Sequence, residues 1–232
     1  YEQLGFHVTD LLSIGKVQYT PWPSGNTLYQ GCNVTVSGVV TADTAQFNSS
    51  YGSYALQDGS GQFSGLIFNT NELEELSRGD DVTVTGLATD LAIGDEFGYK
   101  FDGNTRLTNS IVTINSSGND VPASELVSCE DIHQIADEVE FYEGVLVKLN
   151  DVTVVSVNEY DWSVTDATGA VALIDDDMAN MEVDNMLSAL IQGQQLESVM
   201  GIFNYSYGII SPEVVFVSDY QEKGCGRGFV FS

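Results

Sequence analysis

Short runs of alternating apolar and polar residues dominate this chain, and Gly, Asn or Asp bounds most of them. Residues 34–36, 82–84 and 152–154 each read Val-Thr-Val, and residues 214–217 form a similar run. Val, Thr, Tyr and Phe favour strands, and a period of two turns one face of a strand toward a core. The pattern therefore predicts an all-β protein.

Two stretches have helical features instead. Residues 71–78 (NELEELSR) begin with acids and end with Arg, which suits the dipole of a short helix. Residues 176–190 (DDMANMEVDNMLSAL) carry Met and Leu at helical spacing. We expect one short helix at each place.

The strands and helices occur twice in the same order. Residues 58–61 (DGSG) match residues 166–169 (DATG), and both lie between the second and third strands of their copy. Asp followed by Gly three residues later is typical of a tight turn, because Gly tolerates positive φ. Each copy has three strands, a helix and two more strands, which is the element order of a five-stranded barrel.

A resemblance to a known family follows from these motifs. The patterns GVVTA…YALQDGSGQFSGLIF…GDDVTVTG and YEGVLVKLNDVTVVS…WSVTDATGAVALIDD…VMGIFNYSYGIISP resemble the oligosaccharide/oligonucleotide-binding (OB) modules of bacterial secreted and cell-surface proteins. Such modules occur beside extracellular nucleases and in surface-anchored proteins. The resemblance implies two tandem OB-type β-barrels, each with a short helix between strands 3 and 4, and an extracellular location. The expected boundaries are an N-terminal extension at 1–30, barrels at 31–126 and 127–222, and a C-terminal extension at 223–232.

Charge narrows the set of partners. The 232 residues include 34 acids and 7 scattered bases, for a net charge of -27. A nucleic-acid-binding surface needs a basic stripe, so we expect no nucleic-acid partner. No apolar run reaches the length of a membrane helix, so no membrane insertion is expected. Tyr1 is not an initiator Met, which suggests a processed chain.

No catalytic motif is present. The chain has two histidines and neither a GxSxG nor an HExxH motif, so we expect no enzyme activity and no cofactor. Three adjacent carboxylates form the densest acidic run, and they suit either helix capping or a calcium ion. These candidate metal ligands are Asp175, Asp176 and Asp177.

Aromatic residues alternate at matched places in the two copies. Residues two apart lie on one face of a strand, where three rings form either core packing or a platform that stacks on a ligand. Because bases are scarce, sugars or a protein fit such a platform better than nucleic acid does. The candidate stacking residues are Phe97, Tyr99, Phe101, Phe203, Tyr205 and Tyr207.

Three cysteines and four Asn-x-Ser/Thr triplets bear on modification. Cys129 and Cys225 flank the second predicted barrel, and a disulfide between them would join its ends, although three buried thiols, Cys32 included, fit equally well. The candidate glycosylation sites are Asn33, Asn48, Asn115 and Asn204.

Both ends of the chain carry apolar residues beyond the five-strand plan. They either pack back on their own barrels or add as strands to the sheet edge of a neighbouring molecule. The candidate assembly residues are Phe6, Val8, Phe229, Val230 and Phe231. The leading interpretation is a non-catalytic structural or adhesion protein that forms homo-oligomers, filaments or a surface layer. The alternatives are a carbohydrate-binding accessory module of a secreted enzyme and, third, a nucleic-acid-binding OB protein.

Overall fold

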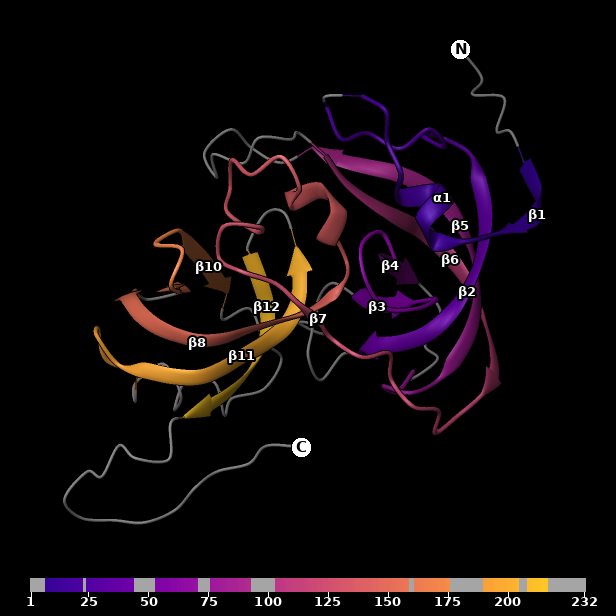
Figure 1. The fold of residues 1–232 in the computed structure, drawn as a ribbon. Helices are drawn as coiled ribbons and strands as arrows, with labels where there is room; N and C mark the ends of the chain where they lie inside the picture. Colours follow the sequence, from indigo (N-terminus) through magenta and orange to yellow (C-terminus); the bar gives the residue numbers. More distant parts are fainter. Residues whose placement is uncertain are drawn as a thin grey trace.

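The structure is a computed structural model. It describes residues 7–22, 24–43, 53–70, 76–92, 103–158, 161–175, 190–204 and 208–216. This part of the chain is mostly β-structure, arranged as two six-stranded sheets that lie side by side (Figure 1). We call the residues up to 116 the first unit and those from 125 onward the second unit.

The first sheet closes into a five-stranded barrel. Its order is β1-β2-β3-β4-β6-β5, and β2 also pairs with β5, which closes the ring. The parallel strand β1 lies outside the ring, along β2. The strands are β1 (His7–Leu12), β2 (Asn33–Ala42), β3 (Ser53–Gln57), β4 (Gly65–Thr70), β5 (Asp81–Ala92) and β6 (Gly103–Ser116).

The alternation of the sequence sets the two faces of this barrel. Val34, Val36 and Val40 of β2 are fully buried in the first core. The intervening Thr35 and Ser37 lie on the outer face and hydrogen-bond hydroxyls of β5 across the sheet, both at 2.8 Å. The apolar set therefore fixes the register, because a slip by one residue would expose it.

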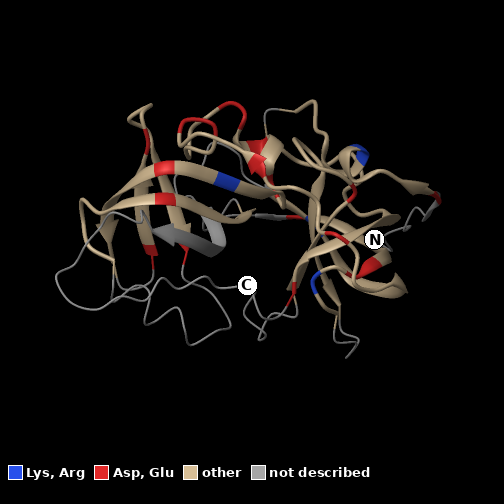
Figure 2. Ribbon diagram, turned by 60° about the horizontal axis from the view of Figure 1, so that its bottom comes forward, with Lys and Arg blue, Asp and Glu red and all other residues tan. Residues whose placement is uncertain are grey.

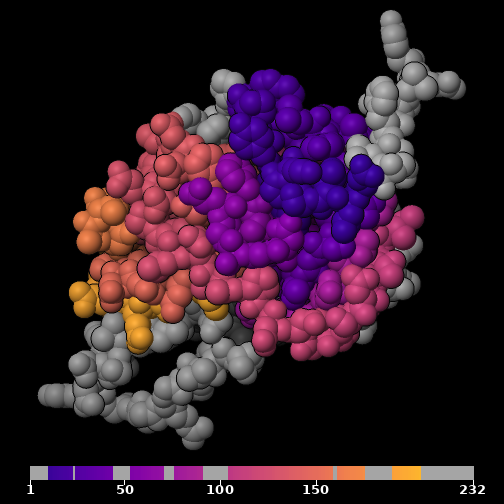
Figure 3. Space-filling model, turned by 45° about the vertical axis from the view of Figure 1, so that its right-hand side comes forward, coloured from indigo at the N-terminus to yellow at the C-terminus, as the bar shows by residue number. Residues whose placement is uncertain are grey.

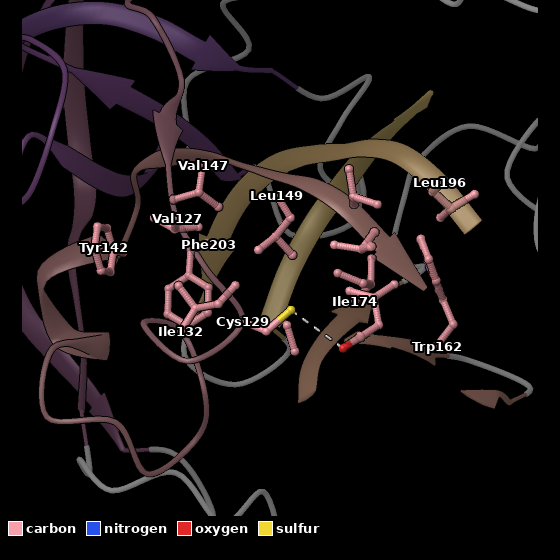
Figure 4. Packing of buried hydrophobic residues seen from close by; sticks show 14 of the residues in the cluster. Val127, Cys129, Ile132, Tyr142, Val147, Leu149, Trp162, Ile174, Leu196 and Phe203 are labelled. Atoms are coloured by element: carbon pink, nitrogen blue, oxygen red, sulfur yellow. Dashed lines mark hydrogen bonds between the residues drawn. The ribbon is translucent and has the colours of Figure 1, made fainter. Parts of the chain in front are cut away.

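The second sheet has the order β11-β12-β10-β9-β8-β7, and β11 also pairs with β8. The contact between β10 and β12 is a single parallel pair, Ile174 with Ile209. The second core lies between these strands and includes Trp162 and Phe203, both fully buried (Figure 4). The strands are β7 (Glu125–Leu126), β8 (Leu146–Val157), β9 (Asp161–Thr165), β10 (Val171–Asp175), β11 (Gln195–Asn204) and β12 (Gly208–Phe216).

The structure places part of the predicted N-terminal extension against the first barrel. After β1 the chain forms the short helix α1 (Ile14–Gln18), whose Ile14 and Val17 are fully buried in the first core. Figure 3 shows the indigo N-terminal part of the described chain lying against the purple residues that follow it. The sequence pattern misses this because α1 covers only five residues, too short for a visible helical period.

The helices predicted between strands 3 and 4 cannot be compared with the structure. Residues 71–75 and 176–189 lie outside the described residues. The described part has two short helices elsewhere, namely α1 and the 3₁₀-helix η3 (Val139–Tyr142) between β7 and β8.

Replacing Ile14 tests whether α1 belongs to the first core. Ile14→Ala removes a fully buried side chain and should lower the free energy of unfolding by about 2–4 kcal/mol in a denaturant titration. Leu11→Ala is the matched control, because Leu11 is 63% exposed. An equal effect of both substitutions would contradict the packing of α1 on the barrel.

Candidate functional site

The two units touch through their backbones at a pair of glycines. Gly65 begins β4, and Gly144 follows η3 with φ of 70°, a conformation that favours glycine. A Cβ added to Gly65 would lie 2.2 Å from the carbonyl carbon and oxygen of Gly144. No side chain fits between these two backbone segments, so glycine at both positions permits this approach.

A buried glutamine amide crosses the same junction. The Gln57 side chain donates to Gly59 O at 3.0 Å and to Ser64 Oγ at 3.1 Å within the first unit. Its Oε1 accepts from the backbone N–H of Leu146 in the second unit at 2.7 Å. Thr165 takes the corresponding place before the DATG turn, and its hydroxyl donates within its own turn, to Ala170 O. Only the first copy of the motif thus reaches into the other unit.

Helix α1 also contacts the second unit. Gln18 Nε2 donates to Gly65 O at 2.7 Å and to Glu143 O at 3.2 Å. Nearby, the N–H of Phe63 donates to Phe141 O at 2.6 Å, and the rings of these two residues lie 4.7 Å apart. The segment of the first 30 residues that covers the barrel therefore also helps to hold the two units together.

An apolar cluster completes the junction. It is formed by residues on the outer faces of both sheets, and Val121 and Met200 pack against it half-buried. We call it the junction cluster: Ala42, Ala55 and Ile67 from the first unit with Leu146 and Ile202 from the second. Burial of these side chains stabilises the packed arrangement of the units.

Carboxyl groups lie buried beside these contacts. Glu143 is 1% exposed, and neither carboxylate oxygen receives a hydrogen bond of good geometry. Burial raises the pKa of Glu143 well above its ordinary value, and nearby Glu140 raises it further. Arg106 favours the charged form, Asp90 opposes it, and the N–H of Thr105 favours it.

Asp90 belongs to the same group of charges. Burial raises the pKa of Asp90, while hydrogen bonds from the Thr105 hydroxyl and the Thr27 N–H act to lower it. These two bonds measure 2.7 and 3.2 Å, and both end on Oδ1. The junction thus collects acidic groups in a place where their charged forms are poorly solvated.

The aspartates of the two turn motifs make the same contact in both units. Asp58 Oδ2 accepts from the N–H of Ile14, and Asp166 Oδ2 accepts from the N–H of Cys129, each at 2.8 Å. Burial opposes ionisation of Asp166, but hydrogen bonds from Thr168 and Cys129 outweigh it and hold its pKa below the ordinary value. Beyond shaping turns, these carboxylates attach the segment that precedes each set of strands.

The structure describes one of the six candidate stacking residues. Phe203 is 0% exposed and points into the second core (Figure 4), so its ring is not available to a ligand and the stacking role is wrong for this residue. Of its two alternatives, core packing is what the structure shows. Phe97, Tyr99, Phe101, Tyr205 and Tyr207 lie outside the residues whose side chains are described.

The acidic run meets the described chain only at Asp175. This residue ends β10 and is buried opposite Asp161 of β9, whereas Asp176 and Asp177 lie outside the described residues. Within the described residues, no group of three or more His, Cys, Asp or Glu is placed to hold a metal ion. The calcium site stays a prediction.

Cys129 is a free, fully buried thiol in the second core, and its Sγ donates to Val164 O at 3.8 Å (Figure 4). Burial, reinforced by the charge of Asp166, raises the pKa of Cys129 to about 12, so the thiol is unreactive at neutral pH. Its candidate disulfide partner Cys225 lies outside the described residues. Cys32 is a half-buried free thiol.

The glycosylation triplets differ in access. Asn115 is exposed, and Asn33 is half-buried on β2. Asn204 is 5% exposed, and its Oδ1 accepts from Asn104 Nδ2 at 2.7 Å, so in the folded chain its side chain is buried at the contact between the units. Asn48 lies outside the described residues.

The candidate assembly residues lie almost entirely outside the described part. Val8 belongs to β1, which pairs in parallel with β2 of its own chain. Phe6, Phe229, Val230 and Phe231 are not described. Whether either end joins a neighbouring molecule stays a prediction.

An open hollow lies on the second unit beside the segment that leads into η3. It has a volume of about 520 Å³ and combines four carboxylates with an imidazole and a small apolar patch. His133 is held there by the N–H of Ile135, which donates to its Nδ1 at 3.4 Å. The lining residues are Glu130, Asp131, His133, Ile135, Ala136, Asp137, Glu138 and Ala170.

The junction residues escaped the sequence analysis. Nothing in the sequence distinguishes Gln57 and Gln18 from ordinary polar residues. Glu140 and Glu143 likewise do not stand out, because the chain has 34 acids. One signal was available: at matched positions the first copy has Gln57 and the second Thr165, so the repeat breaks where the units meet.

Comparisons with known proteins add no relative. Neither a protein-family model nor a curated protein matches this chain. In the part of the chain that the structure describes, no helix has the length and apolar character to span a membrane.

Substituting Gly65 tests the junction. Gly65→Ala places a methyl group against the Gly144 backbone, so the two units must separate locally, and we expect a loss of at least about 2 kcal/mol in the free energy of unfolding. Gly59→Ala is the control, because an added Cβ there meets nothing within 4 Å. Equal stabilities in urea titration would show that the backbones are not in contact.

Proposed function

We propose that this chain is a non-catalytic extracellular structural or adhesion subunit. In this proposal two OB-type barrels act as one stiff body, and terminal strands add to the β-sheets of neighbouring copies. The extracellular location draws support from the composition and from the resemblance of the turn motifs. The acids spread over both units (Figure 2) disfavour a nucleic-acid partner.

The pairings and turn contacts of the second unit support a second barrel of the same type. Its strands follow the same order of pairing as those of the first unit. The N–H of Gly79, just before β5, donates to Val40 O at 2.9 Å. The N–H of Gly193, just before β11 in the second unit, donates to Val154 O at 2.8 Å. Together with the matched contacts of Asp58 and Asp166, these bonds favour two copies of one module.

The junction supports the idea of a stiff body. Its backbone contact, hydrogen bonds and junction cluster leave no flexible joint between the described units, in contrast to two domains on a linker. A rigid pair of barrels holds its outer edges at a constant spacing. Constant spacing is what a repeating assembly requires.

The observation that carries the proposal is an open edge on each sheet. The edge strand of the sheet is β1 in the first unit and β7 in the second. No described strand pairs with the outer edge of either. Leu11 in β1 and Leu126 in β7 are 63% and 64% exposed. Unpaired backbone beside an exposed leucine is a surface to which another strand can add.

Deleting residues 228–232 tests the assembly. We expect the parent chain to form filaments in electron micrographs. The deletion removes an apolar strand candidate, so it should abolish these filaments while the circular dichroism of the barrels is retained. Ile135→Ser is the control, because it removes an exposed apolar side chain away from both edges and should leave assembly intact. An unchanged particle size after the deletion would refute strand addition through this end.

A second candidate is a carbohydrate-binding accessory module, and the hollow lined by Glu138 and Asp137 favours it. Carboxylates accept hydrogen bonds from sugar hydroxyls, and this hollow presents four of them around a small apolar patch. If this candidate is right, a glycan array gives hits with the parent chain that Asp137→Asn with Glu138→Gln weakens at least about tenfold. The control is Glu197→Gln, an exposed acid on β11 outside the hollow. An array without hits would exclude this candidate.

A further inference from the structure

Buried oxygen atoms without donors gather where the two units meet. Gln18 Oε1 from α1, Asn104 Oδ1 from β6 and both carboxylate oxygens of Glu143 are buried and receive no hydrogen bond of good geometry. All three side chains are at least nine-tenths buried. Amide and carboxylate oxygens in such a place are costly unless a proton, a donor or a cation reaches them.

Among the described groups that act on Glu143, the acids outnumber the bases. The carboxyl groups of Glu140 on η3 and Asp90 on β5 oppose its ionisation, and the guanidinium of Arg106 on β6 favours it. From α1, the uncharged Gln18 side chain approaches the backbone carbonyl of Glu143. One proton on the carboxyl pair reduces the excess of negative charge among these described groups, because it removes one of the like charges that oppose ionisation of Glu143.

Glu143 sits where its charge state acts on the contact between the units. Its carbonyl oxygen accepts from Gln18, and the next residue, Gly144, touches Gly65. The N–H of Gly144 in turn donates to Phe203 O at 2.9 Å. The Glu143 carboxyl group belongs to the second unit, and Arg106, Thr105 and Asp90 of the first unit act on it, so water that solvates a negative charge there has to enter between the units.

We propose that the Glu140–Glu143 carboxyl pair makes the junction proton-sensitive: with a proton on the pair the two units stay packed, and loss of that proton loosens the contact between them. The stiff pair of units then becomes a hinged pair as the pH rises. The described residues offer no group of three acidic, His or Cys side chains that would hold a metal ion in its place.

The direction of the effect follows from proton binding. In the unfolded chain Glu143 ionises near its ordinary pKa of 4.5, and in the folded chain its pKa is raised well above that value. Between these two pKa values the folded chain binds more protons than the unfolded chain, so its stability falls as the pH rises through this window. Below pH 4.5 the contribution of Glu143 is constant.

Hydrogen exchange on the full chain tests the proposal at the junction itself. The N–H of Leu146, bonded to Gln57, and the N–H of Phe63, bonded to Phe141, report contacts between the units, and the amides of β2 and β5 report the barrel. From pH 5 to pH 9 the protection factors of the two junction amides should fall by up to about tenfold per pH unit inside the window, while those of the barrel hold.

Glu143→Gln keeps the shape of the side chain and removes its titration. In this variant the fall in protection at Leu146 and Phe63 should disappear. Glu197→Gln, an exposed acid, is the matched control and should behave as the parent does. Should the Gln variant fold poorly, the pH course of the parent alone decides, because junction protection that is constant from pH 5 to pH 9 overturns the proposal.

A cation is the competing explanation and gives a different outcome. If millimolar CaCl₂ restores junction protection of the parent at pH 9 but has no effect on Glu143→Gln, the carboxyl pair binds a cation and the proton-based proposal is overturned. If protection still falls with pH in Glu143→Gln, another group is responsible, which also overturns it. Loss of the fall in the variant, with no effect of CaCl₂, supports it.

Discussion

The approach of two backbones at Gly65 and Gly144 is the constraint on which the arrangement of this molecule depends. A Cβ at Gly65 would lie 2.2 Å from the opposing carbonyl group, so any other residue there would hold the units apart. The neighbouring contacts need this closeness, because the Gln57 amide reaches Leu146 and the Gln18 amide reaches Glu143 only across a short gap. The junction cluster is likewise buried only when the two outer faces meet.

The same closeness gives the acids of this chain two different roles. Acids occur on both units (Figure 2), and most of the described ones are exposed or half-buried, where water solvates them and their repulsion keeps molecules apart. Glu143 lies inside the junction, where burial raises its pKa and its ionised form works against packing. In our proposal a subunit with such a junction is stiffer at lower pH and looser at higher pH, so the proposed assembly and the proposed proton sensitivity concern the same contact.

Much of the first unit was predictable from local patterns. The Val-Thr-Val runs give strands whose apolar side is buried, and the DGSG and DATG turns lie between strands as expected, with Gly61 and Gly169 at positive φ. The place of α1 was not predictable, because five residues show no helical period and their burial depends on a barrel formed by later strands. The pattern left Phe203 open between core packing and ligand stacking, because an alternating strand has two faces and the sequence does not tell which one is covered; in the structure its ring is buried.

The amino-acid sequence alone determines the strands, the turns and the acidic surface. The strands follow from the alternation of apolar and polar residues, the turns from the φ preferences of Gly and Asp, and the acidic surface from the summed charge, and all of these are local or additive properties. Tertiary structure decides the junction. Gln57 and Leu146 are 89 residues apart, and their hydrogen bond exists only when two separately formed sheets pack together. Glu143 is chemically identical to the chain's other glutamates, and only its burial between the units distinguishes it, since the free energy of a charge depends on its surroundings rather than on its neighbours in sequence.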